Sequence, residues 1–285
     1  MIETWLLLGA GRCGLQLARA MRAAGLELAG VVAHSARSRR RARRALPDVA
    51  LVPARGRLPR CGGVVVAVPD PAIADCAAAL APRLAPATRV ALHTSGLMPA
   101  SALAALAGAG CRIGSLHPLA SFPSATGPAV PLGGVLAAVE GDAAAVREAR
   151  ALARRLGMRP VAVAAETKPL YHAAAALAAN LTHVLAVTAV TQLERAGLER
   201  RTAAAGLRAL IDGSVDAALA ARGMEHLTGP LARGDVAAVR AHLAALPSDV
   251  ASAYRAVARL ALGALAAERI LADAAVRTLR TALTG

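Results

Sequence analysis

Short apolar runs alternate with amphipathic stretches through the first half of the chain. The apolar runs cover residues 4–8, 26–33, 63–68, 89–92, 112–115, 135–139 and 160–163. Stretches with the apolar spacing of helices lie between several of them, at residues 13–24, 71–84, 99–107 and 142–156. Strands that are apolar throughout are buried on both faces, which is typical of a mostly parallel sheet between helices. The pattern therefore predicts an α/β fold with a doubly wound parallel sheet.

The strand-like runs stop near residue 166. Helical periodicity fills the rest of the chain, over residues 168–196, 199–221, 235–245 and 248–283. We therefore expect two domains: an α/β domain over residues 1–165, and an all-helical domain over residues 166–285 that serves substrate binding and dimerisation.

One stretch of this second half could be taken for a membrane span. Residues 169–191 contain no Asp, Glu, Lys or Arg, and their length is sufficient to cross a bilayer. However, the stretch includes His172, Asn180, Thr182 and His183, and many of its apolar residues are alanines. We expect a helix buried at a domain or homodimer interface, and no membrane.

The amino-acid composition of the chain limits which classes of ligand and macromolecule it could bind. The formal net charge of +15 favours anionic ligands. The arginines are scattered apart from a run at residues 37–44, and aromatic residues make up only 1%, so few side chains could stack on bases. The four cysteines form no CxxC pair and no metal-ligand spacing with the histidines. We expect a cytoplasmic protein with reduced thiols, no bound metal and no nucleic acid.

A glycine pattern gives the first functional signal. Gly9, Gly11 and Gly14 form GxGxxG, with Arg12 and Cys13 between the last two, after an apolar run and at the start of a helical stretch. In that context the glycines allow a tight turn and bring a pyrophosphate close to the helix N-terminus. The sequence therefore predicts a Rossmann domain that binds a dinucleotide at these residues.

The end of the second strand indicates which dinucleotide. NAD enzymes usually carry Asp or Glu there for the ribose hydroxyls, whereas this chain has Ser35 and Arg37 and no carboxylate. Ser35 can donate a hydrogen bond to a 2′-phosphate and Arg37 can pair with it, so we expect NADP (NADPH). The alternative is that the run over residues 37–44 is a solvated helix face, which we expect of Arg41, Arg43 and Arg44.

Other polar residues follow strand ends, where ligands bind in such sheets. Val68 and Pro69 end one apolar run and are expected to line the cofactor, as are His93 and Ser95 near its nicotinamide end. His117 follows the next strand and is a candidate catalytic residue. A hydrogen-bonded structural histidine remains the alternative for both His93 and His117.

Lys168 is the only lysine in a chain with 33 Lys and Arg residues. Lysine can shift its pKa and transfer a proton, whereas arginine stays protonated. Lys168, His172 and Asn180 are spaced by multiples of four, which places them in one row along a helix. Lys168 or His172 could donate a proton and Asn180 could orient a substrate. The alternative is a helix that caps itself with these groups and hydrogen-bonds a partner helix.

Taken in order, the segments GAGRCG, HTSG, SLHP, KPLYHAAAALAAN and TGPLARGD resemble those of the Rossmann-like oxidoreductases with a C-terminal helical domain of unknown function. That family is similar to pyrroline-5-carboxylate reductases and 6-phosphogluconate dehydrogenase-like enzymes. The resemblance implies a nicotinamide cofactor at Gly9, Gly11 and Gly14, and a helical domain that dimerises. In the related hydroxyacid dehydrogenases an Asn follows the catalytic Lys by four residues, where this chain has His172.

These observations predict an NADP-dependent oxidoreductase that transfers a hydride to or from a small anionic carbonyl or imine compound. The alternative is a non-catalytic NADP-binding sensor or scaffold protein, because a fold alone does not establish turnover.

Overall fold

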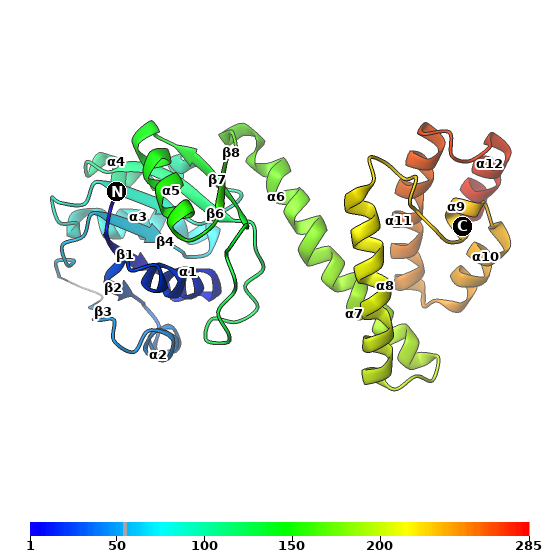
Figure 1. Cartoon of the computed structure of the whole chain (residues 1–285), viewed down its shortest axis with the longest axis horizontal. Helices are drawn as coiled ribbons and strands as arrows, with labels where there is room; N and C mark the ends of the chain where they lie inside the picture. The colour runs from blue at the N-terminus through cyan, green and yellow to red at the C-terminus, as the bar shows by residue number, and fades with distance from the viewer. Residues whose placement is uncertain (54–55, 285) are drawn as a thin grey trace. The chain divides into compact units, whose positions relative to one another are not determined.

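The computed structural model describes residues 1–53 and 56–284 and divides the chain into two compact units. The first unit spans Met1–Ala179 and the second Asn180–Gly285 (Figure 1). Each unit has a hydrophobic core of its own.

The first unit is built on a single sheet. Its strands are β1 (Thr4–Leu8), β2 (Glu27–Val32), β3 (Leu51–Val52), β4 (Gly63–Val66), β5 (Val90–His93), β6 (Arg112–Pro118), β7 (Leu136–Gly141) and β8 (Arg159–Ala162). The spatial order is β3-β2-β1-β4-β5-β6-β7-β8. Every neighbouring pair is parallel except β6 and β7, which are antiparallel. The predicted α/β fold with a mostly parallel sheet is confirmed. The short strand β3 was not predicted.

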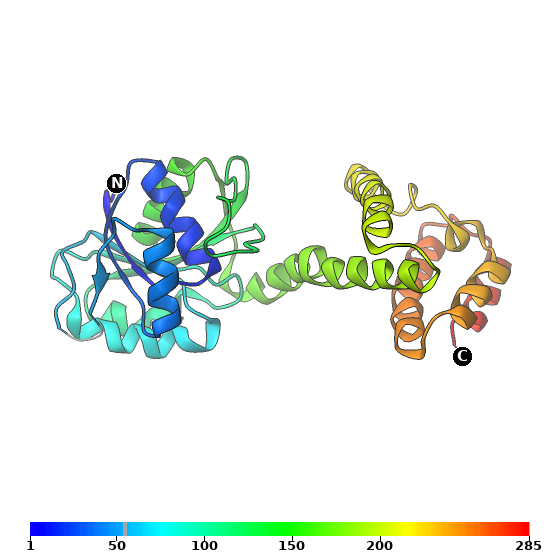
Figure 2. The same cartoon turned by 90° about the horizontal axis from the view of Figure 1, so that it is seen from below.

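Helices cover both faces of this sheet (Figures 1 and 2). They are α1 (Arg12–Ala23), α2 (Ala36–Ala45), α3 (Ile73–Leu80), α4 (Ala104–Gly108) and α5 (Ala143–Arg155), with 3₁₀ turns η1 (Asp70–Ala72), η2 (Ala81–Arg83), η3 (Ala100–Leu103) and η4 (Ala165–Thr167). Helix α6 (Lys168–Ala176) follows η4 and buries only Lys168. Along β1, Leu7 joins the core beneath α1 and α5, while Leu6 and Leu8 join the core beneath α3 and α4. Because both faces are covered, β1 is apolar at every position from Trp5 to Leu8.

The strand register brings one row of residues to the same edge of the sheet. Leu8 pairs with Val66, Val66 with His93, and His93 with Ser115. Across the antiparallel pair, Ser115 lies opposite Glu140. The polar members of this row therefore lie on adjacent strands, at the edge where ligands bind in doubly wound sheets.

The second unit is all-helical, as the sequence predicts. Its helices are α7 (Thr182–Arg195), α8 (Arg200–Ala220), α9 (Pro230–Arg233), α10 (Val236–Ala245), α11 (Ser248–Ala267) and α12 (Asp273–Ala282). The core cluster of this unit comes from α10, α11, α12 and Leu283. Helix α7 contains no buried residue, and α8 contains only one, Ala203. These two helices therefore bury little apolar surface within one chain.

Residues 248–283 form two helices rather than the expected single one. Helix α11 ends at Ala267, and Arg269 adopts a positive φ of 56°. A non-glycine residue in this left-handed region terminates a helix, so α12 begins separately at Asp273. In contrast, the helix expected from residue 235 begins as predicted, because the Asp235 carboxylate accepts a hydrogen bond from the Ala238 amide at 3.0 Å.

The division between the units lies at Ala179, whereas the sequence analysis places it at residue 165. The difference arises because α6 begins at Lys168, which is buried against the first unit. The expected straight row along this helix is wrong at its far end, because residues Leu177–Leu181 form a π-helical turn. A π turn holds one residue more than an α turn, so Asn180 leaves the row that contains Lys168 and His172.

Two helical stretches, Ala165–Arg195 and Ser248–Ala267, are long and apolar enough to cross a membrane by length and composition alone. Helices buried in soluble assemblies have the same properties. Along α7, large apolar side chains are exposed in the single chain, with Val184 at 56% and Leu185 at 47%.

Candidate active site

The turn between β1 and α1 is closed tightly against the loop after β4. Gly9 has a φ of +101°, and a Cβ atom there would collide with the carbonyl oxygen of Ala67. A Cβ at Gly14 would lie 2.8 Å from the Gly9 carbonyl oxygen and 2.8 Å from the Ala67 Cβ. Helix α1 begins after Gly11 with no side chain capping its amides. Glycines are therefore required here, and the open amides form the usual cradle for a dinucleotide pyrophosphate.

Arg12 and Cys13 occupy the first turn of α1. Arg12 is exposed and Cys13 is half-buried. Burial raises the pKa of the Cys13 thiol to about 11, partly offset by a hydrogen bond with Thr94. Cys13 is therefore a neutral thiol that connects the glycine turn to the loop after β5.

At the end of β2, Ser35 is the N-cap of α2. The Ser35 hydroxyl accepts from the Ser38 amide at 3.0 Å and lies 3.0 Å from the Ser38 hydroxyl. Arg37 is exposed in the first turn of α2, and no ion-pair partner for it lies in the described part of the chain. The guanidinium of Arg37 is thus available to an anion at this edge of the sheet, while the Ser35 hydroxyl already has partners in the protein.

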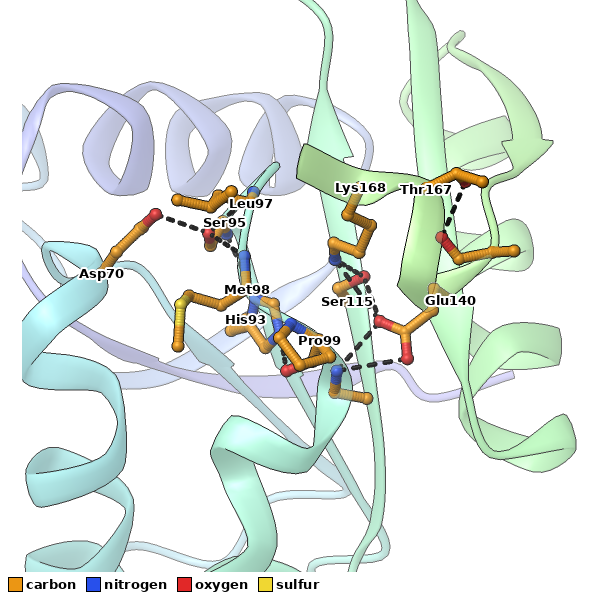
Figure 3. A network of polar contacts seen from close by, with 12 residues as sticks. Asp70, His93, Ser95, Leu97, Met98, Pro99, Ser115, Glu140, Thr167 and Lys168 are labelled. Carbon is orange, nitrogen blue, oxygen red and sulfur yellow. Dashed lines mark hydrogen bonds and ion pairs between the residues drawn. The ribbon is translucent and has the colours of Figure 1, made fainter. Parts of the chain in front are cut away.

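The loops after β4 and β5 are held together by Ser95 (Figure 3). The Ser95 hydroxyl donates to the Asp70 carboxylate at 2.8 Å and accepts from the amides of Leu97 and Met98 at 3.1 and 2.9 Å. Asp70 follows directly on Val68 and Pro69, of which Val68 is half-buried and Pro69 exposed. The two loops predicted to line the cofactor are therefore one connected structure.

His93 is fully buried at the end of β5. The Ser95 amide donates to its Nδ1 at 3.2 Å, and its Nε2 lies 3.1 Å from the Pro99 carbonyl oxygen. Burial, together with the positive charge of Lys168, lowers the pKa of His93 to about 4. Both ring nitrogens of this neutral imidazole have main-chain partners, which matches the structural alternative for His93.

His117 lies near the end of β6 and makes contact with α6. Its Nδ1 is 2.9 Å from the Tyr171 hydroxyl, and its ring meets those of Tyr171 and His172 edge to face. A Cβ added to Gly96 would lie 3.0 Å from His117 Nε2 and 2.9 Å from His172 Nδ1. The His172 Nδ1 atom is buried without a hydrogen-bond partner among the described residues. The structure therefore brings the side chains of His117, Tyr171 and His172 together next to Gly96, the glycine of the HTSG segment.

The Lys168 residue at the start of α6 is buried, with an exposure of only 3%. Its Nζ donates to the Ser115 hydroxyl at 2.8 Å and pairs with Glu140 at 3.4 Å (Figure 3). Burial lowers the pKa of Lys168, and Glu140 opposes that shift. The Glu140 carboxylate also accepts from the Ala100 amide at 2.9 Å. Lys168 is thus paired inside the protein, while Asn180 is exposed in the second unit.

Glu140 is a residue that the sequence analysis missed. A single carboxylate directly after the apolar run 135–139 was the available signal, because a charge in a buried strand requires a partner. Nothing in the spacing identifies that partner as Lys168, 28 residues away. Within the described residues, no group of three His, Cys, Asp or Glu side chains could hold a metal ion.

Comparisons with known proteins agree with this architecture. Residues 5–118 match the Rossmann-like domain model, and residues 135–261 match a domain of unknown function named DUF2520. The second match begins inside the first unit, at β7. No curated protein matches the sequence.

Solved structures similar to the chain include oxidoreductases and a protein whose activity is not stated. A proposed NADP oxidoreductase from Bacteroides fragilis is 20% identical, with a TM-score of 0.77 over 91% of this chain and 97% of that one. Protein TM1727 from Thermotoga maritima is 22% identical, with a TM-score of 0.68 over 93% and 99%. Pyrroline carboxylate reductase from Plasmodium falciparum, solved with NADP bound, is 14% identical, with a TM-score of 0.60 over 99% of both chains.

At these identities the likeness concerns the fold, which this chain shares with NAD(P)-dependent oxidoreductases. The domain matches cover the glycine turn as well as the Lys168 helix. The chain therefore joins a Rossmann-like domain to a C-terminal DUF2520 domain.

Proposed function

We propose that this protein is a cytoplasmic, NADP-dependent oxidoreductase that acts on a small anionic carbonyl or imine compound, without nucleic acid or a membrane as partner. The observation that carries the proposal is the sheet edge of the first unit. The glycine turn lies there on the same strand ends as His93 and Ser115, and His117 follows two residues later on β6. A dinucleotide site next to a group of titratable side chains is the arrangement that hydride transfer requires.

The residues of this edge divide into roles. Gly9, Gly11 and Gly14 fit a pyrophosphate, because side chains at Gly9 and Gly14 would collide with backbone. Arg37 would bind the 2′-phosphate of the cofactor, which supplies or accepts the hydride when it is bound. Val68 and Pro69 belong to the loop that lines the same edge.

Reduction of a carbonyl or imine also requires a group of the protein that donates a hydrogen bond or a proton to the reacting oxygen or nitrogen. His117 and His172 are the candidates that the site supports best, because one nitrogen of each ring adjoins Gly96. The ammonium of Lys168 is already bound to Ser115 and Glu140. Asn180 stays a candidate for orienting the substrate.

A non-catalytic NADP-binding sensor or scaffold is the competing function. A thermal-shift screen with NADPH, NADH, small keto acids and cyclic imines, followed by absorbance assays at 340 nm of any compound that stabilises the protein further, separates the two. Cofactor oxidation by one compound of the panel supports the oxidoreductase. Binding of NADPH with no additional stabilisation or turnover across the panel supports the sensor.

Arg37→Ala is expected to weaken NADPH binding by about tenfold, because a charge-assisted hydrogen bond to phosphate contributes about 1.5–3 kcal/mol. NADH affinity is expected to be unchanged. Isothermal titration calorimetry of both cofactors measures the difference, and Arg44→Ala, an exposed arginine in the last turn of the same helix, is the control. Equal affinities of the wild-type protein for NADPH and NADH contradict the proposed selectivity.

We further propose that the protein is a homodimer. A groove of about 640 Å³ lies between α7, α8, α10 and α11 of the second unit, and most of its lining is apolar. Val184 and Leu185 belong both to this groove and to the exposed face of α7. A second copy offers the same apolar face of α7, whose charged residues, Glu194 and Arg195, lie only at its C-terminal end, so a symmetric contact would cover groove and helix together.

Light scattering at micromolar concentration is expected to give the mass of a dimer. Leu185→Glu is expected to shift the protein to monomer, because it places a charge in the proposed apolar contact. Leu136→Glu, a similarly exposed leucine in the first unit, is the control and should leave the dimer intact. A wild-type protein with the mass of a monomer would contradict the proposed dimer but not the fold described above.

A further inference from the structure

His117 is surrounded by titratable groups from four parts of the first unit. Its Nδ1 contacts Tyr171, and His172 meets its ring edge to face. The charges of Lys168 and Asp70 act on it, and it acts in turn on His93. Glu140, on the neighbouring strand β7, is paired with Lys168. The groups facing it come from η1, β5, β7 and α6: Asp70, His93, Glu140, Lys168, Tyr171 and His172.

The position of Lys168 follows from the period of β6. Ser115 and His117 are two residues apart on that strand, so their side chains lie on the same face of the sheet. Because Lys168 Nζ is hydrogen-bonded to Ser115, its ammonium is held on that face. Tyr171 and His172 follow about one helical turn later on α6, so the same helix supplies both the charge and the partners of the His117 ring.

Lys168 does not extend outward from this position. Its 3% exposure and its bonds to Ser115 and Glu140 leave the ammonium inside the protein. A buried charge nevertheless acts on its neighbours, since the surroundings screen it less than water does. Lys168 can therefore influence a reaction through the protonation of His117 without touching a substrate.

The titration of His117 agrees with this geometry. Burial, then His172 and then Lys168 lower the pKa of His117 to about 4, while Asp70 acts in the opposite direction. Burial also raises the pKa of Tyr171, which keeps its hydroxyl protonated. At neutral pH the pair is thus an uncharged imidazole and an uncharged phenol, joined at Nδ1.

We propose that Lys168 is a positioning residue whose buried charge adds to burial in disfavouring the protonation of His117, and that the neutral ring accepts a hydrogen bond from Tyr171 at Nδ1 and carries its proton on Nε2. The role of this tautomer rests on the proposed function: in the reaction, the Nε2–H group donates a hydrogen bond to the carbonyl or imine of the substrate. Gly96 is part of the arrangement because a Cβ atom there would lie 3.0 Å from His117 Nε2 and 2.9 Å from His172 Nδ1, so the two rings would have to shift.

Histidine ¹⁵N NMR of the full-length protein tests the proposal without substrate or cofactor. The ¹⁵N shifts distinguish the two neutral tautomers from imidazolium, and the His117→Gln variant assigns the resonances. Titrations from pH 8 to pH 4 are compared for wild type, Lys168→Arg, Lys168→Met and Lys168→Met/Glu140→Gln. The double variant is included because it removes both buried charges and so avoids leaving Glu140 unpaired.

In wild type and in Lys168→Arg, His117 is expected to stay neutral to below pH 5 with its proton on Nε2. Lys168→Met is expected to bind a proton at His117 about tenfold more tightly, and the double variant less so, because it also removes the opposite charge of Glu140. A His117 titration unchanged in both variants overturns the proposal, as does a wild-type proton on Nδ1. Because these readouts need no ligand, failure to bind NADPH would refute the proposed function and leave this result standing.

Discussion

Replacing His117 with glutamine is expected to lower NADPH-dependent turnover by about 10²–10³-fold, the usual cost of removing a positioned hydrogen-bond donor to the reacting group. Glutamine retains an amide that can hydrogen-bond to Tyr171, yet it lacks the ring that places one nitrogen on Tyr171 and the other beside Gly96. NADPH affinity is expected to remain within about twofold, because the glycine turn and Arg37 are on other strands. Steady-state kinetics on the compound found in the screen measures turnover, and calorimetry measures cofactor binding.

The matched control is His226→Gln, an exposed histidine of the second unit, which should leave turnover unchanged. His172→Ala is expected to reduce turnover as well. If the two histidines act on one substrate atom, the double variant should lose less than the product of the single losses. Normal turnover in His117→Gln would exclude His117 as the hydrogen-bond donor to the substrate and direct attention to His172 alone.

The fold could be predicted because its determinants are local in sequence. Runs such as residues 63–68 are apolar at every position. Such a run is typical of a strand that is covered by helices on both faces. The GxGxxG pattern is equally local, since a positive φ at Gly9 and close backbone contact at Gly14 are properties of the turn itself. The strands other than β3, the mostly parallel sheet and the glycine turn therefore followed from the printed sequence.

The candidate site could be predicted only in part, because its contacts join distant segments. Composition identified Lys168, and strand-end position identified His117. The pairing of Lys168 with Glu140 connects α6 to β7, and no spacing rule indicates it. The π turn at Leu177–Leu181 likewise shows no local signal, so the sequence placed Asn180 in a straight row that the backbone does not form.

The contribution of Lys168, the only lysine, should also be measurable in the free energy of unfolding of the first unit. Lys168→Met is expected to lower the free energy of unfolding by about 3 kcal/mol, because it leaves the Glu140 carboxylate, only 13% exposed, without its cation. Glu140→Gln should be destabilising for the converse reason. The double variant is expected to lose less than the sum of the two, since no buried charge is then unpaired.

Urea denaturation followed by tryptophan fluorescence reports on the correct unit, because Trp5 is the only tryptophan and is buried in β1. Asp48→Asn is the control, since it breaks the exposed Arg22–Asp48 pair of the same unit and exposed pairs contribute at most about 1 kcal/mol. A loss in Lys168→Met as small as in this control would mean that the Lys168–Glu140 pair does not hold α6 to the sheet. A large loss that the double variant largely recovers would show that charge pairing, rather than packing of the lysine stem, fixes α6 over Ser115 and His117.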